Sequence, residues 1–119
     1  MVGDSLMRTL FYLAIITCND DMVVAFEEPE AHIHPYFVKE LAERIARDDR
    51  GNQYFISTYS PLFLLTLLEK APKNDVNVFV THYENHETKV RPLSEEQVEK
   101  IFEYGDDVFF NLGTISEET

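Results

Sequence analysis

The pattern of apolar and polar positions predicts helices and short strands in alternation. Ser5 to Thr17 is apolar on nearly all sides, as expected of a helix that is buried on several of them. Met22 to Phe26 is an uninterrupted apolar run, typical of a strand covered on both faces, and Gln53 to Ser57 predicts a second short strand. Strand aromatics such as Tyr54 and Phe55 are expected in the core.

Capping residues locate three further helix starts. His34-Pro35 and Ser60-Pro61 each place a proline in the first helical turn, where its missing N–H has no consequence. Ser94 to Gln97 has the form of a capping box at the start of another helix. The residues expected to point inward from these helices are Phe37, Leu41 and Ile45, then Leu62, Leu65 and Leu68, and last Val98, Ile101 and Phe102.

The C-terminal part predicts a β-hairpin. Val76, Val78 and Val80 alternate with polar residues, and the turn residues Asn85-His86-Glu87 lead into a second strand from Lys89 to Pro92. The segment from Val108 to Leu112 is typical of either a strand or a packed extension. Alternating strands and helices indicate an α/β parallel sheet flanked by helices with a C-terminal hairpin. At 119 residues the chain has room for a single domain, residues 1–119.

The segment VVAFEEPEAHIHP carries the clearest chemical signal. An apolar strand delivers Glu27 and Glu28 at its carboxyl end, which is where chemistry is found in parallel sheets. Nucleotide hydrolysis needs two such carboxylates: one holds Mg²⁺, usually through water, and the other polarises the attacking water. A strand that ends in two glutamates is also common on solvated surfaces, so the specificity lies in the longer run EEPEAHIHP.

That run resembles the Walker B motif and D-loop of ABC-type ATPases, especially the AAA-like branch that includes the overcoming-lysogenisation-defect (OLD) family. The resemblance implies a metal-side role for Glu27 and a general-base role for Glu28. It also implies that Ala31, His32 and His34 belong to a D-loop that faces a second subunit. The implied fold is the C-terminal half of a P-loop NTPase.

Two other segments resemble motifs of the same branch. Ile56 to Pro61 is similar to the switch motif S-T-H-S-P, with Tyr59 where the family has a histidine that reaches the γ-phosphate. Gly3-Asp4-Ser5 with Arg8 is similar to a degenerate signature motif that caps ATP bound by the opposite protomer, with Ser5 in place of the usual glycine. Tyrosine donates one hydrogen bond but has no positive charge near neutral pH, which puts ordinary hydrolysis in doubt.

The phosphate-binding loop is missing from these residues, since no G-x-x-x-x-G-K-[ST] occurs. We therefore expect Mg²⁺ and ATP to bind in a complete assembly but not to the isolated chain. In this class the phosphate-loop strand would lie between Gln53–Ser57 and Val76–Thr81. The partner that fills the gap is expected to be a second copy or a separate chain with the phosphate loop. Two alternatives stay open: a degenerate non-hydrolysing scaffold or regulatory module, and a chain that hydrolyses ATP on its own.

Composition limits the other possibilities. The chain has 22 acidic and 10 basic residues, a net charge of −12, which disfavours direct nucleic acid binding. A lone Cys18 is consistent with a reducing compartment. The apolar stretch from Leu10 to Ile16 is too short to span a bilayer, so the expected location is the cytoplasm. Two histidine pairs, His32 with His34 and His82 with His86, lack the cysteines that would favour zinc.

Overall fold

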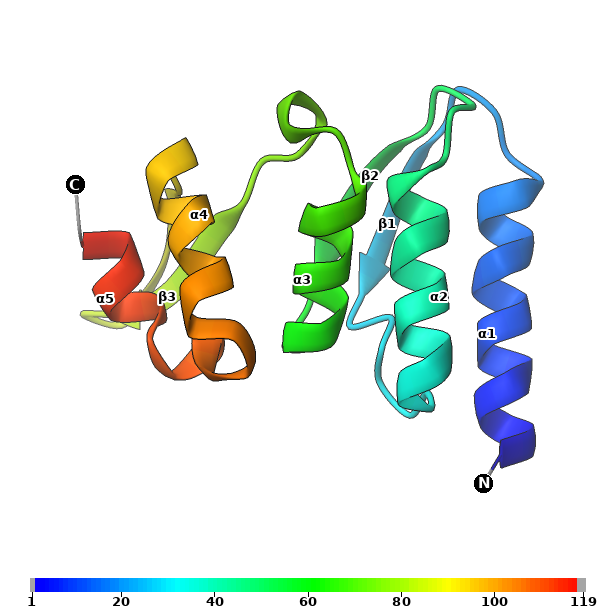
Figure 1. Ribbon diagram of the computed structural model, residues 1–119, viewed down its shortest axis with the longest axis horizontal. Coiled ribbons are helices and arrows are strands. Elements are labelled where there is room, and N and C mark those ends of the chain that lie inside the picture. Colours follow the sequence, from blue (N-terminus) through cyan, green and yellow to red (C-terminus); the bar gives the residue numbers. More distant parts are fainter. Residues whose placement is uncertain (1, 118–119) are drawn as a thin grey trace. The chain divides into compact units, whose positions relative to one another are not determined.

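The computed structural model describes residues 2–117 (Figure 1). The α-helices are α1 (Val2–Thr17), α2 (Pro35–Ala46), α3 (Pro61–Lys70), α4 (Glu95–Tyr104) and α5 (Leu112–Glu117). The strands are β1 (Val23–Glu27), β2 (Gln53–Ser57), β3 (Phe79–Glu84) and β4 (Glu87–Pro92). Two short 3₁₀ helices are η1 (Lys73–Asp75) and η2 (Gly105–Phe110).

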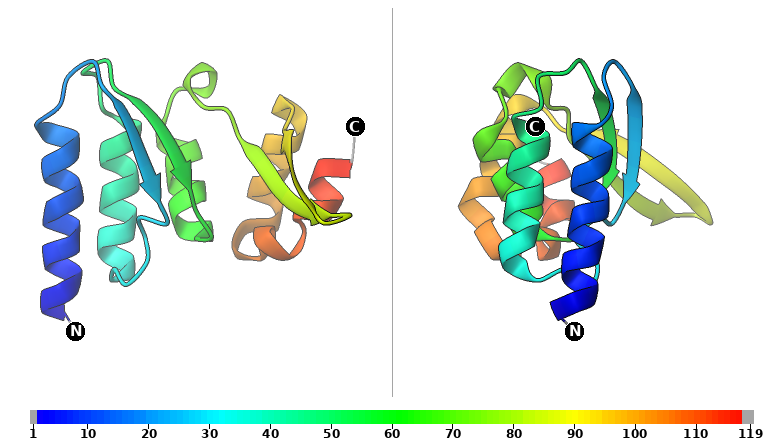
Figure 2. Two further views of the ribbon diagram at one scale, coloured as in Figure 1. Left: turned by 180° about the vertical axis from the view of Figure 1, so that it is seen from behind. Right: turned by 90° about the vertical axis from the view of Figure 1, so that its right-hand side faces the viewer.

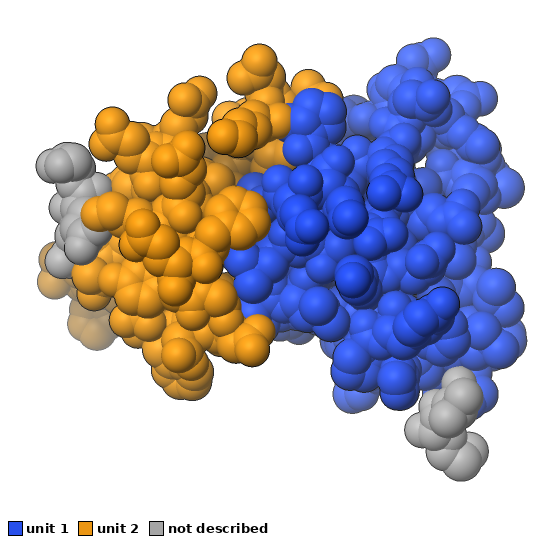
Figure 3. Space-filling view, viewed as in Figure 1, with its two compact units in different colours: residues 1–72 blue, residues 73–119 orange. Residues whose placement is uncertain are grey.

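Contacts along the chain gather into two compact units, residues 1–72 and residues 73–119 (Figure 3). The first unit contains a parallel pair of strands with three helices, and the second contains an antiparallel hairpin with two short α-helices. This confirms an α/β architecture with a small parallel sheet, consistent with part of a P-loop NTPase fold. The interpretation of residues 1–119 as one domain stays a prediction.

The parallel sheet of the first unit consists of β1 and β2. Helix α2 connects them, because parallel strands need a crossover of this length. Val23 is paired with Gln53 at one end of the register, and Glu27 is paired with Ser57 at the other. The carboxyl ends of the two strands therefore lie side by side.

One face of this sheet forms the core of the first unit. Val24 and Phe26 of β1 are buried against the three helices, which all lie on the same side of the strands (Figure 2). Leu41 of α2 and Phe63 of α3 are fully buried, and the Tyr12 ring of α1 meets the Phe26 ring edge-on at 5.0 Å between centroids. Burial of these large side chains is the main stabilising contribution in this unit.

The other face of the sheet is exposed, so the prediction that β1 is covered on both faces is wrong for this chain. Side chains alternate between the two faces of a strand, and Val23 is 66% exposed while Val24 is buried. On β2, Phe55 is 59% exposed, whereas Tyr54 packs against the core. No element of residues 2–117 pairs with the second edge of β2, and β3 belongs to a different sheet.

Three helices also differ from their predicted burial. In α4, Phe102 is 48% exposed although it was expected to point inward. Helix α1 begins at Val2 rather than near Ser5, and only part of its surface is covered. Its exposed large apolar side chains are Leu6, Met7, Leu10 and Phe11. In α3 the buried residues are Phe63 and Thr66, while Leu62 is exposed. A helix packed against a single layer buries one stripe of side chains, so apolar residues on its remaining surface stay in solvent.

The predicted helix caps are confirmed. Pro35 and Pro61 are the first residues of α2 and α3, and each follows a side-chain cap. The Tyr36 N–H donates to His34 Nδ1 over 3.2 Å. The Ser94 hydroxyl and the Gln97 side chain form a reciprocal capping box at α4.

The second unit confirms the predicted hairpin in part. Strands β3 and β4 pair antiparallel, but β3 begins at Phe79 rather than at Val76. Asn85 and His86 form the turn, both with positive φ, which is the geometry of a two-residue hairpin loop. The tail that the sequence left open forms η2 and α5. The buried apolar residues of this unit are Val80, Ile101, Val108 and Ile115.

A hydrogen-bond network fixes the turn before β2. The Asp48 carboxylate accepts hydrogen bonds from the Tyr54 hydroxyl, the Asn52 amide and the Arg50 N–H. Asn52 also accepts from the Met22 N–H over 2.9 Å, which connects this turn to the start of β1. Partial burial opposes ionisation of Asp48, but these hydrogen bonds outweigh it and lower the pKa of the carboxyl group.

We expect Asp48→Asn to reduce stability by about 1.5 kcal/mol at neutral pH, because a charged acceptor of three hydrogen bonds is lost. The pKa of Asp48 is lower in the folded state than in the unfolded chain, so its contribution is present above the ordinary value of 3.8 and is lost as pH falls below it. Urea unfolding at pH 7 and pH 3 would measure this. The variant should differ from the natural chain at pH 7 and much less at pH 3; an equal difference at both would contradict the assignment.

Candidate functional site

The two glutamates lie at the carboxyl end of β1, as predicted. Glu27 is the last residue of the strand, and its side chain is exposed on the uncovered face of the sheet. Glu28 leaves the strand with a φ of 45° and is partly buried. The Glu28 N–H donates to the Ser57 carbonyl over 2.8 Å, which holds the two strand ends together. The carboxylates therefore project in different directions from one sheet edge.

The turn that follows has an unusual backbone. Glu28 and His32 both have positive φ, a region that residues other than glycine rarely adopt. Pro29 between them is fully buried, and the Ala31 N–H donates to the Glu28 carbonyl over 3.0 Å. Residues with such backbone conformations persist where surrounding contacts enforce them, and they are frequent at functional sites. Ala31, His32 and His34 thus belong to one tightly folded turn between β1 and α2.

The segment after β2 lies beside this turn. The Thr58 hydroxyl donates a hydrogen bond to Glu30 Oε1, and the Ser60 N–H donates to Thr58 Oγ1 over 3.1 Å. Tyr59 lies between these two anchored residues, and its side chain is 75% exposed. The switch-like segment and the segment after the glutamates are thereby in direct contact.

The signature-like segment has a different place from the predicted one. Gly3, Asp4 and Ser5 lie within the first turns of α1, not ahead of it, because the helix already begins at Val2. Ser5 is 5% exposed, and its hydroxyl accepts a hydrogen bond from the His34 N–H over 2.7 Å. In this chain Ser5 therefore attaches α1 to the start of α2.

Most residues of this edge are predicted from the sequence, but Glu30 and Thr58 are not. Glu30 lies in the run EEPEAHIHP and Thr58 in the segment Ile56 to Pro61, yet neither motif assigns them a role. The only available signal was a third carboxylate, three residues after Glu27, and a hydroxyl next to Tyr59. His34 caps α2 through its side chain. Among residues 2–117, no group of three or more histidine, cysteine, aspartate or glutamate side chains is arranged to hold a metal ion.

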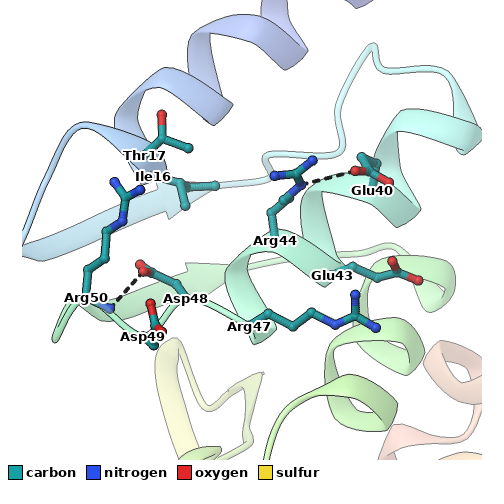
Figure 4. Close-up of a pocket in the computed structure, with 9 residues that line it drawn as sticks. All are labelled: Ile16, Thr17, Glu40, Glu43, Arg44, Arg47, Asp48, Asp49 and Arg50. Atoms are coloured by element: carbon teal, nitrogen blue, oxygen red, sulfur yellow. Dashed lines mark hydrogen bonds and ion pairs between the residues drawn. The ribbon is translucent and has the colours of Figure 1, made fainter.

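An open hollow of about 440 Å³ lies elsewhere, between the end of α1 and the end of α2 (Figure 4). Its lining includes Arg44, Arg47 and Arg50, together with four acidic side chains, so opposite charges are mixed. Arg44 forms an ion pair with Glu40 at 3.1 Å. The residues from 48 to 50 precede β2, which places this hollow at the opposite end of the sheet from Glu27 and Glu28.

The parallel pair of β1 and β2, with carboxylates at the carboxyl end of β1, is consistent with part of a P-loop NTPase fold. A family model matches residues 2–65, more than half of the chain, and its description is "AAA domain, putative AbiEii toxin, Type IV TA system". The chain belongs to this family. No protein with a curated description matches the sequence. Within residues 2–117, every helix is too short or too polar to cross a membrane.

Proposed function

We propose that residues 1–119 supply the hydrolysis edge of an ABC-type ATPase and act together with a phosphate-loop segment that lies outside them. The observation that carries the proposal is the pairing of the Glu27 end of β1 with the Ser57 end of β2. This pairing places a carboxylate pair and the switch-like residues at one edge, as hydrolysis of a bound nucleotide requires. Membership of the AAA-domain family supports the same interpretation.

The two carboxylates suit different tasks. Glu27 is exposed on the open face of the sheet, where its oxygens can bind Mg²⁺ through water. Glu28 is partly buried beside the switch-like segment and is the candidate general base that polarises the attacking water. Glu27 would hold the ion through water, and phosphate oxygens of the nucleotide would supply further ligands. When bound, Mg²⁺ would neutralise charge that develops on the phosphates.

The exposed parts of the first unit indicate the kind of partner. Parallel sheets are normally covered on both faces, and two strands alone are marginally stable. Here β2 has one unpaired edge within residues 2–117, and Val23 and Phe55 are exposed on the open face. A strand that pairs with β2 would extend the sheet and bring a phosphate loop beside the carboxyl end of β2, one strand away from Glu28. A phosphate-loop chain or segment, or a second copy of this chain, would meet this need.

A non-hydrolysing scaffold or regulatory module is the second candidate. The buried position of Ser5 favours it, because the Ser5 hydroxyl accepts from the His34 N–H inside the fold and does not face a nucleotide. Tyr59 in place of the family's histidine favours it as well. In this version the chain keeps the surface that faces a partner but does not take part in hydrolysis.

Calorimetric titration of Mg-ATP into residues 1–119 tests whether nucleotide binding needs a phosphate-loop segment outside these residues. We expect no measurable heat of binding, because the backbone cradle and the lysine that hold the phosphates are missing from these residues. Glu28→Gln serves as the matched variant and should behave identically. Saturable binding that changes in Glu28→Gln would contradict the proposal, since the chain would then build a phosphate site without the usual loop.

A further inference from the structure

Glu30 connects two segments that are far apart in the sequence. Its carboxylate belongs to the turn after β1, and it accepts a hydrogen bond from the hydroxyl of Thr58, which lies 28 positions away after β2. Both side chains are partly buried. A hydrogen bond to a charged group that is shielded from water is among the stronger ones in proteins.

The bond to Glu30 is the first in a series that continues into α3. Thr58 Oγ1 accepts from the Ser60 N–H over 3.1 Å, and the Ser60 hydroxyl accepts from the Phe63 N–H, also over 3.1 Å. Phe63 is fully buried in the core. The series therefore runs from a carboxylate at the sheet edge, through the switch-like segment, to the first turn of a packed helix.

Tyr59 is an exposed residue between two anchored neighbours. Thr58 and Ser60 on either side take part in the series of hydrogen bonds, and Tyr59 is 75% exposed. A backbone that is already anchored has little conformational freedom left to lose when its side chain binds, which favours binding.

We propose that Glu30 is the positioning residue of this edge: through Thr58 it holds the backbone of Tyr59 in place after the end of β2. The role of Tyr59 toward nucleotide rests on the proposed function. The mechanical coupling from Glu30 to Tyr59 does not, because it is a property of the nucleotide-free chain. Glu30 acts through Thr58 and not on the reacting atoms.

Backbone ¹⁵N relaxation and amide exchange of the nucleotide-free chain test the coupling. In Glu30→Ala we expect the order parameter of the Tyr59 amide to fall from about 0.85 to below about 0.6, the range of flexible backbone. The Ser60 amide should exchange at least about 10-fold faster, because its acceptor is no longer held in place. Thr58→Val should have the same effect, and the double variant should be no worse than either single one, since all three break the same series.

Two conservative variants and one distant variant serve as controls. Glu30→Gln and Thr58→Ser keep an acceptor and a hydroxyl, so both should restore an ordered Tyr59. Asn52→Ala removes hydrogen bonds at the opposite end of the sheet, where Asn52 joins Met22 to Asp48. It should lower stability and leave the Tyr59 order parameter unchanged. This control separates positioning from a general loss of stability.

Two results would overturn the coupling: an unchanged Tyr59 amide in Glu30→Ala, or equal loosening of Tyr59 in Asn52→Ala. Both are recorded without nucleotide, so they are independent of the calorimetric test. Binding of Mg-ATP to the isolated chain would contradict the proposed function while leaving the Glu30 result intact. A rigid Tyr59 in Glu30→Ala would contradict the positioning role of Glu30 and would leave the proposed function unaffected.

Discussion

Replacement of Phe63 by alanine is expected to lower the free energy of unfolding by about 3–5 kcal/mol, the usual cost of removing a buried phenylalanine ring. Phe63 has no exposed surface, and it packs in the cluster that includes Val24, Phe26 and Leu41. The cavity left by the ring would be lined by side chains of β1, α2 and α3. Urea unfolding followed by circular dichroism would measure the loss.

Phe55→Ala is the matched control, because it removes the same ring from the opposite face of the sheet. Phe55 is 59% exposed, so the expected cost is below about 1 kcal/mol. The comparison also reports on the open face in solution. A cost for Phe55→Ala that approaches that of Phe63→Ala, and that grows with protein concentration, would mean that a second copy covers this face.

The second large effect is expected for Glu28 in a completed enzyme. Joining the phosphate-loop half of another member of the AAA-domain family ahead of residue 2 would provide a phosphate loop. If residues 1–119 form a hydrolysis edge, this chimera should hydrolyse Mg-ATP. Glu28→Gln should then reduce the rate by about 10²- to 10⁴-fold, the usual contribution of a general base.

Two controls make the chimera informative. Glu69→Gln changes a largely exposed carboxylate near the end of α3 and should have no effect on the rate. Tyr59→His introduces the histidine of the switch motif that this segment resembles, and should raise the rate if the tyrosine limits it. A chimera that binds Mg-ATP but shows no hydrolysis, with or without Tyr59→His, would favour the non-hydrolysing scaffold.

Features that depend on local physical chemistry could be predicted from the sequence. The bounds of β2 were predicted as observed, and Pro35 and Pro61 mark the starts of α2 and α3. The capping box at Ser94 is also as predicted. Each of these depends on backbone geometry and hydrogen bonds among residues a few positions apart, which are read directly from neighbouring letters. The position of Glu27 and Glu28 at a strand end is of the same kind.

The extent of burial could not be predicted in this way. A continuous apolar run such as Val23 to Phe26 is compatible with cover on both faces or on one, because the pattern shows what could be buried and not what is available to bury it. The same holds for Leu6 to Phe11 in α1. Which face is covered depends on the number of layers in the fold, and within the first unit the three helices α1, α2 and α3 all lie on one face of the sheet.

The sequence by itself determined the alternation of strands and helices, the caps of α2, α3 and α4, and the placement of two carboxylates at the end of an apolar strand. Only the tertiary structure decided which residues far apart in the sequence come into contact. The Ser5 hydroxyl accepts from the His34 backbone N–H across 29 positions, and the Glu30 carboxylate accepts from the Thr58 hydroxyl across 28. Such contacts arise from the parallel pairing of β1 with β2 and from the packing of α1 against α2. They depend on three-dimensional packing between elements, which no local pattern of residues encodes.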